Sequence, residues 1–184
     1  MNKQFLDDAI KQFSYYKMLG EKTFEQLEEQ DYFWQYHDES NSIAIIVQHL
    51  CGNMLSRWTN FLVEDGEKPW RNRDAEFEKK IFTSKDLLIK WDEGWNCVFE
   101  ALKLIKPGNY DQIIYIRNMG HSIDAAIIRQ LNHYSYHIGQ IVYIGRMRKG
   151  SKWVNLSISK GKSERYNQNK FSKPRRNEHF TDDL

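Results

Sequence analysis

His133 and His137 lie four residues apart in the segment NHYSYHIGQ, residues 132–140. In a helix, residues at this spacing stack on one face, so both imidazoles would point in the same direction. Two neutral imidazoles placed in this way can reach one metal ion at about 2.0–2.1 Å, with a third ligand from another segment. The spacing therefore indicates a candidate divalent-metal site. The alternative is a pair of core histidines that only satisfy backbone hydrogen-bond partners.

His49 is the candidate for the third ligand. It shares a helical face with Ile45, Ile46 and Asn53, and the apolar neighbours indicate that this face points into the protein. Three protein ligands leave a coordination position open for water or substrate, which is typical of catalytic rather than structural sites. Imidazole ligands suit nickel, copper and zinc alike, so the residues indicate a transition metal without selecting one.

Three carboxamides lie about one helical turn from the histidines. Gln130 and Gln140 flank the HxxxH pair, and either could accept the second N–H of an imidazole and so orient the ring. Asn53, one turn beyond His49, could form a hydrogen bond with a substrate or with a ligand of the metal. Each residue also has a simpler interpretation, as a polar group at a helix contact, and both interpretations stay open.

Arg57 follows one turn after Asn53, and the segment KPWRNRD, residues 68–74, adds Arg71 and Arg73. Guanidinium groups match carboxylates well, so these arginines could form a cationic rim that recognises a substrate carboxylate. They could equally tie a long loop to the body of the protein through ion pairs. Trp70, in the same segment, is expected to be buried.

Hydrophobic periodicity predicts four helices, over residues 3–29, 42–64, 85–105 and 123–150. The N-caps expected for the last three are Asn41 or Ser42, Thr83 or Ser84, and Ser122. Gly20 should weaken the first helix by about 1 kcal/mol relative to alanine. A β-branched run within residues 111–123 predicts a small hairpin or an irregular crossover. The fold predicted is all-α, a four-helix bundle with long inter-helix connections.

The composition is that of an ordinary globular chain of 184 residues, with 40% hydrophobic and 28% charged residues. We expect one domain over residues 1–166 and a polar, basic tail over 167–184. Residues 151–184 carry a net charge of +4 and the rest of the chain −2, so nucleic-acid binding is not expected. The start of the chain lacks an apolar signal core, and no apolar run could cross a membrane. Two cysteines, Cys51 and Cys97, suit reduced thiols in the cytoplasm.

His49 followed by the HxxxH pair resembles the DinB-like (YfiT-type) superfamily of metal-binding four-helix bundles. The segments that carry the resemblance are IVQHLCGNMLSRWTNFLVEDGEKPWRNRDAEF (46–77), RQLNHYSYHIGQIVYIGR (129–146) and WVNLSISKGKS (153–163). The resemblance implies a homodimer that holds a divalent ion, typically zinc or nickel, through His49, His133 and His137. Some relatives transfer low-molecular-weight thiols such as bacillithiol to electrophiles. Ser159 departs from the pattern, because the family often has proline there.

Two functions follow from this resemblance. The first is a cytoplasmic, metal-dependent thiol S-transferase that acts on small electrophiles. In such an enzyme the metal would favour the thiolate form of a thiol co-substrate, whose unperturbed pKa lies near 8.5, so no protein cysteine need act as the nucleophile. The alternative is a non-catalytic metal-binding protein, with a stress-response or structural role in a dimer.

Overall fold

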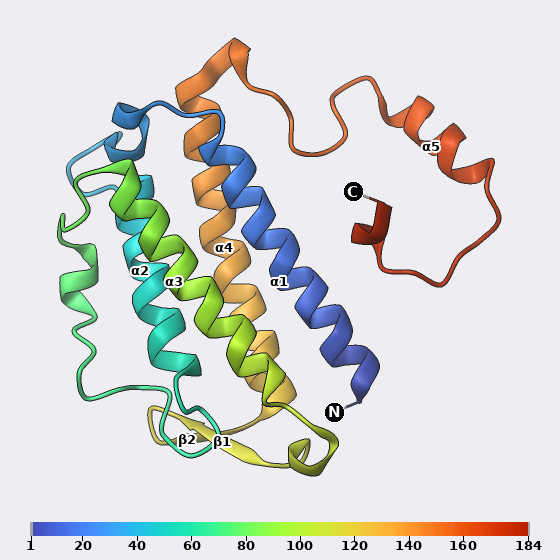
Figure 1. Cartoon of the computed structure of the whole chain (residues 1–184). Helices are drawn as coiled ribbons and strands as arrows, with labels where there is room; N and C mark the ends of the chain where they lie inside the picture. The colour runs from blue at the N-terminus through green and yellow to red at the C-terminus, as the bar shows by residue number, and fades with distance from the viewer. Residues whose placement is uncertain (1, 184) are drawn as a thin grey trace.

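The computed structural model describes residues 2–183. Most of the chain is helical, and four long helices lie side by side (Figure 1): α1 (Lys3–Phe24), α2 (Ile43–Trp58), α3 (Ser84–Lys103) and α4 (Ile123–Lys149). Helix α2 packs against α3, α1 packs against α4, and α2 also contacts α4. The prediction of a mostly helical fold is confirmed.

Side-chain caps fix where the last three long helices begin. The hydroxyl oxygens of Ser42, Thr83 and Ser122 accept hydrogen bonds from the backbone N–H three residues further on, as is usual for N-caps. The prediction is therefore confirmed for Ser122, and the open choices between neighbouring residues are settled in favour of Ser42 and Thr83.

Two helices end at least five residues earlier than predicted. Helix α1 stops at Phe24 instead of residue 29, and the chain continues into a 3-10 helix, η1 (Glu29–Phe33). Helix α2 stops at Trp58 instead of residue 64, because Thr59 is extended, with ψ of 123°, and Asn60 then adopts a left-handed conformation with φ of 48°. A right-handed α-helix contains no left-handed residue, and asparagine tolerates that conformation. The prediction extended too far because the apolar residues after Asn60 keep the helical spacing in the sequence.

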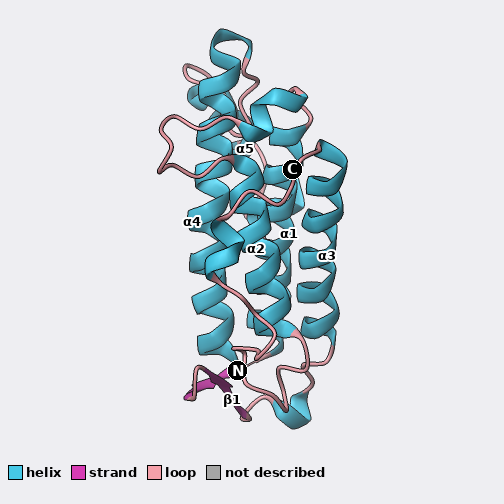
Figure 2. Ribbon diagram, turned by 90° about the vertical axis from the view of Figure 1, so that its left-hand side faces the viewer, coloured by secondary structure: helices cyan, strands magenta, loops and turns pink. Residues whose placement is uncertain are grey.

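The predicted hairpin is present at one end of the helices (Figure 2). Strands β1 (Ile113–Ile116) and β2 (Met119–Ser122) pair in antiparallel fashion. The turn consists of Arg117 and Asn118, both with positive φ, and not of Asn-Met-Gly as the sequence suggested. The Asp65 carboxylate accepts hydrogen bonds from the backbone N–H of both turn residues, at 2.8 and 2.7 Å. A loop that follows α2 thereby holds the hairpin in place.

Aromatic side chains fill the centre of the helical core. Phe13, Trp95 and Tyr134 are fully buried and pack against one another, and the Trp58 indole N–H donates to the Tyr134 hydroxyl at 3.0 Å. Trp70, which we expected to be buried, is 58% exposed.

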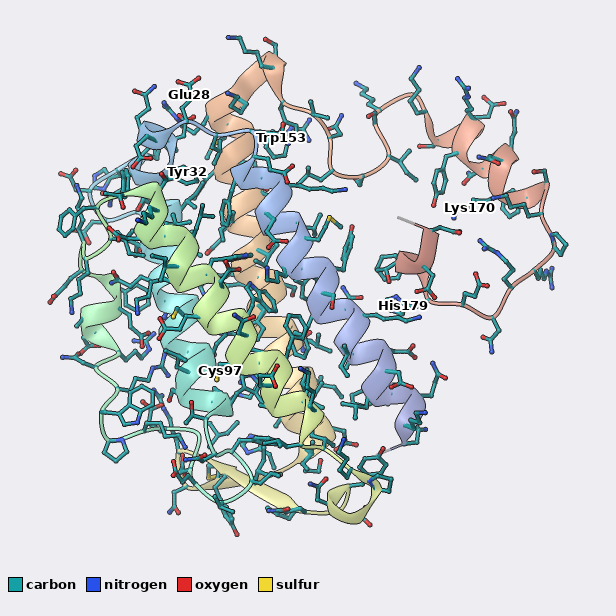
Figure 3. The ribbon with its side chains drawn as sticks, in the orientation of Figure 1. Glu28, Tyr32, Cys97, Trp153, Lys170 and His179 are labelled. Carbon is teal, nitrogen blue, oxygen red and sulfur yellow. The ribbon has the colours of Figure 1, made fainter. Side chains whose placement is uncertain are left out.

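The C-terminal segment leaves the four long helices (Figure 1). It contains a short helix that the sequence analysis did not predict, α5 (Ser163–Phe171), and Lys170 on this helix stands away from the long helices (Figure 3). The end of the chain returns to α1, where Phe180 packs on Tyr15 and Asp182 pairs with Lys11 at 2.7 Å. Among residues 2–183, none of the helices combines the length and the apolar character needed to cross a bilayer.

Gly20 gives a test in which packing and helix propensity predict opposite signs. A Cβ at Gly20 would lie 2.4 Å from the Trp91 ring, which is 2% exposed and cannot move away freely. We expect Gly20→Ala to lower the free energy of unfolding by about 1–3 kcal/mol through overpacking. The matched control is Gly139→Ala on α4, where a Cβ would meet nothing within 4 Å. For Gly139→Ala, we expect the free energy of unfolding to rise by up to about 1 kcal/mol, because alanine has the higher helix propensity. Urea unfolding measures the free energy of unfolding of both variants. A more stable Gly20→Ala variant would contradict the close contact between Gly20 and Trp91.

Candidate metal centre

Three imidazoles converge between two helices, His49 from α2 and His133 and His137 from α4. One candidate ligand atom from each lies within 4.8 Å of the other two. The Nε2 atoms of His49 and His133 are 3.4 Å apart. Around a tetrahedral ion with bonds of 2.0–2.1 Å, neighbouring ligand nitrogens are about 3.3–3.4 Å apart. The cluster therefore could hold one metal ion.

The second nitrogen of two of these rings has a side-chain partner. His49 Nδ1 lies 2.9 Å from Glu76 Oε2, and His137 Nδ1 lies 2.9 Å from Gln140 Oε1. Both rings therefore keep Nε2 free for a ligand bond. Within residues 2–183, the buried Nδ1 of His133 has no hydrogen-bond partner.

Glu76 is the residue that sequence reasoning missed. It lies on η2 (Asp74–Phe77), in the connection between α2 and α3, and is 8% exposed. Arg71 donates to both of its oxygens, from Nε at 2.7 Å and from Nη2 at 2.9 Å. Burial alone would raise the pKa of the Glu76 carboxyl, but the hydrogen bonds from His49 and Arg71 and the charge of Arg71 outweigh it and lower the pKa. The carboxylate is therefore ionised at neutral pH.

Of the other site residues predicted from sequence, the structure places Gln140 against His137, as described. Asn53 and Gln130 are buried on α2 and α4, and their side-chain oxygens lack hydrogen-bond partners in the described part of the chain. The hydrogen bonds of the structure therefore do not decide between the two interpretations of Asn53 and Gln130.

Arg57 is buried and ties the loop to α2. Its guanidinium donates to the Gly66 carbonyl and pairs with Glu67 at 3.1 Å. Arg71 is engaged with Glu76, while Arg73 is exposed and lies over the Phe77 ring. Arg57 and Arg71 therefore make the internal contacts of a loop tie.

The cysteines lie away from the histidines. Cys51 is buried with its sulfur 3.8 Å from Glu93 on α3, and burial, followed by the Glu93 charge, raises its pKa to about 12. Cys97 on α3 (Figure 3) is half-buried, with Sγ 3.6 Å from Thr59 Oγ1, and burial raises its pKa as well. His121 also stays outside the cluster, because its ring contacts the Met119 carbonyl on the hairpin. None of these three groups is placed to bind a metal with the histidine cluster.

Burial keeps His133 and His137 uncharged. It lowers the pKa of His133 to about 3, helped by the neighbouring imidazoles of His137 and His49. It also lowers the pKa of His137 to about 4, although the hydrogen bond to Gln140 works in the opposite direction. At neutral pH both rings are therefore in the neutral form, which is the form that binds a metal ion.

The fold and the site together define a mostly helical protein with a three-histidine cluster that could hold a metal ion. The chain belongs to the family described as "Protein of unknown function (DUF1572)", whose model matches residues 1–162. That range includes the three histidines and Glu76. No curated protein and no solved structure matches the chain.

The lowered pKa values predict a pH dependence for the metal-free protein. Unfolded histidines titrate near pH 6.5, whereas His133 and His137 titrate near 3 and 4 in the folded state. Between those limits the unfolded state binds more protons, so stability is greatest above about pH 6.5 and falls as the pH drops. We expect a slope of up to about 1.4 kcal/mol per pH unit for each histidine.

Urea unfolding of chelator-treated protein between pH 7 and pH 5 measures this slope. The control is the double variant His133→Gln/His137→Gln, whose stability should depend less on pH in this range. Equal slopes for the two proteins would show that the folded imidazoles titrate normally.

Proposed function

We propose that the protein binds one divalent transition metal ion, zinc or nickel, through His49, His133 and His137 in a DinB-like four-helix bundle. The observation that carries the proposal is the convergence of three ligand atoms within 4.8 Å. The neutral state of His133 and His137 and the 3.4 Å separation of the Nε2 atoms of His49 and His133 support it. The chain supplies three nitrogen ligands and so leaves a coordination position for an exogenous group.

We further propose a metal-dependent thiol S-transferase that uses a low-molecular-weight thiol and acts on small electrophiles. A bound transition metal lowers the pKa of a coordinated thiol and supplies a nucleophile at neutral pH. The raised pKa values of Cys51 and Cys97 support an external thiol, because neither protein thiol ionises readily. In the reaction, a carbon–sulfur bond forms, the leaving group departs with its electron pair, and the thiol proton passes to solvent.

The second candidate is a non-catalytic metal-binding protein, with a stress-response or structural role in a homodimer. Two observations favour it. His49 and His137 are 4% and 8% exposed, so an ion would link α2 to α4 inside the protein. In addition, apolar side chains are exposed along one side of α4, as a dimer contact would require: Ile128, Tyr136, Tyr143 and Met147.

Elemental analysis of gently purified protein tests the metal site. We expect about one ion per chain in the wild type and its loss in His49→Ala, His133→Ala and His137→Ala, because two imidazoles bind an ion much more weakly than three. His121→Ala, which removes an imidazole from the hairpin, should keep the ion. Unchanged metal content in all three cluster variants would overturn the proposal.

A thiol-consumption assay separates the two functions. Metal-loaded protein should accelerate the loss of bacillithiol or another small thiol in the presence of a panel of electrophiles. Chelation and His133→Ala should abolish this activity, and Cys51→Ser and Cys97→Ser should retain it. Metal-loaded protein that is silent with several thiols would support the non-catalytic role.

A further inference from the structure

We propose that Glu76 is a positioning residue for His49, and that the loop which carries it is built to hold the carboxylate there. The inference rests on the proposed metal site and adds a residue that acts on the metal through a ligand. It follows from the contacts of three groups: the Glu76 carboxylate, the His49 ring and the surface of α2 between them.

The hydrogen bonds of Glu76 determine the form of the His49 ring. An ionised carboxylate can only accept hydrogen bonds, so His49 Nδ1 must carry the proton in the 2.9 Å contact with Glu76 Oε2. When His49 binds a metal ion, a proton on Nδ1 leaves the Nε2 lone pair as the ligand, on the side of His133. Arg71 grips the same carboxylate through two parallel N–H donors, a geometry that fixes both position and orientation.

Helix α2 provides a cradle for this carboxylate. Gly52 lies three residues after His49, and a Cβ at this position would be 2.4 Å from Glu76 Oε1 and 2.7 Å from its carboxyl carbon. Only a residue without a side chain therefore lets Glu76 approach the helix here. Glycine costs about 1 kcal/mol in a helix interior, and its presence inside α2 has this packing reason.

A second residue of α2 fixes the backbone that carries Glu76. The Gln48 side-chain amide lies 3.2 Å from the Ala75 carbonyl and 2.8 Å from the carbonyls of Glu76 and Glu78. The Phe77 ring stacks on the His49 ring, with centroids 4.7 Å apart. The loop thus contacts α2 at Gln48 and at His49. The Glu76 carboxylate contacts the edge of the His49 ring, and Phe77 contacts its face.

The three imidazoles differ in their outer partners. His49 has a charged acceptor, His137 has the neutral Gln140, and the Nδ1 of His133 has no partner within residues 2–183. A carboxylate partner increases the basicity of a ligating imidazole, and loss of such a partner typically weakens metal binding 10- to 100-fold. His49 should therefore be the strongest donor of the three.

Competition with a chromophoric zinc chelator tests the role of Glu76. Glu76→Gln should lower the affinity for Zn²⁺ by about 10- to 100-fold while it keeps one ion per chain. The absorption spectrum of the Co²⁺-loaded variant should also shift, since the donor strength of one ligand changes. Glu78→Gln removes an exposed carboxylate from the same loop and should leave both readouts at wild-type values.

Gly52→Ala is the second variant, because Glu76→Gln removes the nearer charge partner of the buried Arg71 side chain, leaves it only Glu67 at 3.5 Å, and could fail to fold. The added methyl group displaces the carboxylate but removes no polar group, so it should also weaken Zn²⁺ binding. Wild-type affinity and an unchanged Co²⁺ spectrum in the folded variants would overturn the inference.

Nitrogen NMR of the His49 ring shows which ring nitrogen carries the proton, so it tests the role of Glu76 without a bound metal. In the metal-free wild type, Nδ1 should carry the proton, and in Glu76→Gln the preference should weaken. If the wild type binds no metal, the proposed function fails, while the NMR result still decides the role of Glu76. A His49 ring protonated only on Nε2 would overturn that role.

Discussion

The site depends on His133 and His137 being uncharged where they lie against other imidazoles in the interior. A buried charge without a partner costs several kcal/mol, so the interior lowers the pKa values of His133 and His137. An uncharged imidazole keeps one nitrogen lone pair that can bind a metal ion, whereas an imidazolium has none. The aromatic core around Tyr134 fixes the position of α4, so the rings cannot separate without disturbing that core.

The connection between α2 and α3 shows how an irregular segment can be part of the interior. Burial of polar groups requires partners for them, and this segment meets the requirement with ion pairs and bonds to backbone carbonyls. Lys68 is 4% exposed and pairs with Glu64, while Arg57 and Arg71 engage acids of the loop itself. The connection thus buries charged side chains in pairs, while Trp70 is exposed.

Much of the fold could be predicted from sequence because helical periodicity and capping residues are local signals. The HxxxH spacing and the inward face of His49 were likewise sufficient to group three histidines. The ends of α1 and α2 were wrong because the apolar spacing continues past the residues at which the backbone changes conformation. Glu76 could not be found because it is 27 residues from His49 and depends on how an irregular loop folds back. Gly52, an unfavourable residue inside a helix, is the sequence signal that could have indicated a close approach.

His49 and His133 are 84 residues apart along the chain. In a denatured chain, bringing them to one point would require closure of a loop of that length, which costs entropy that the folded protein has already lost. An ion that binds both residues would therefore bind the folded chain more tightly than the denatured chain. The melting temperature would then rise with the free concentration of the ion. Metal supply would then set the abundance of folded protein in a cell as well as the occupancy of the site.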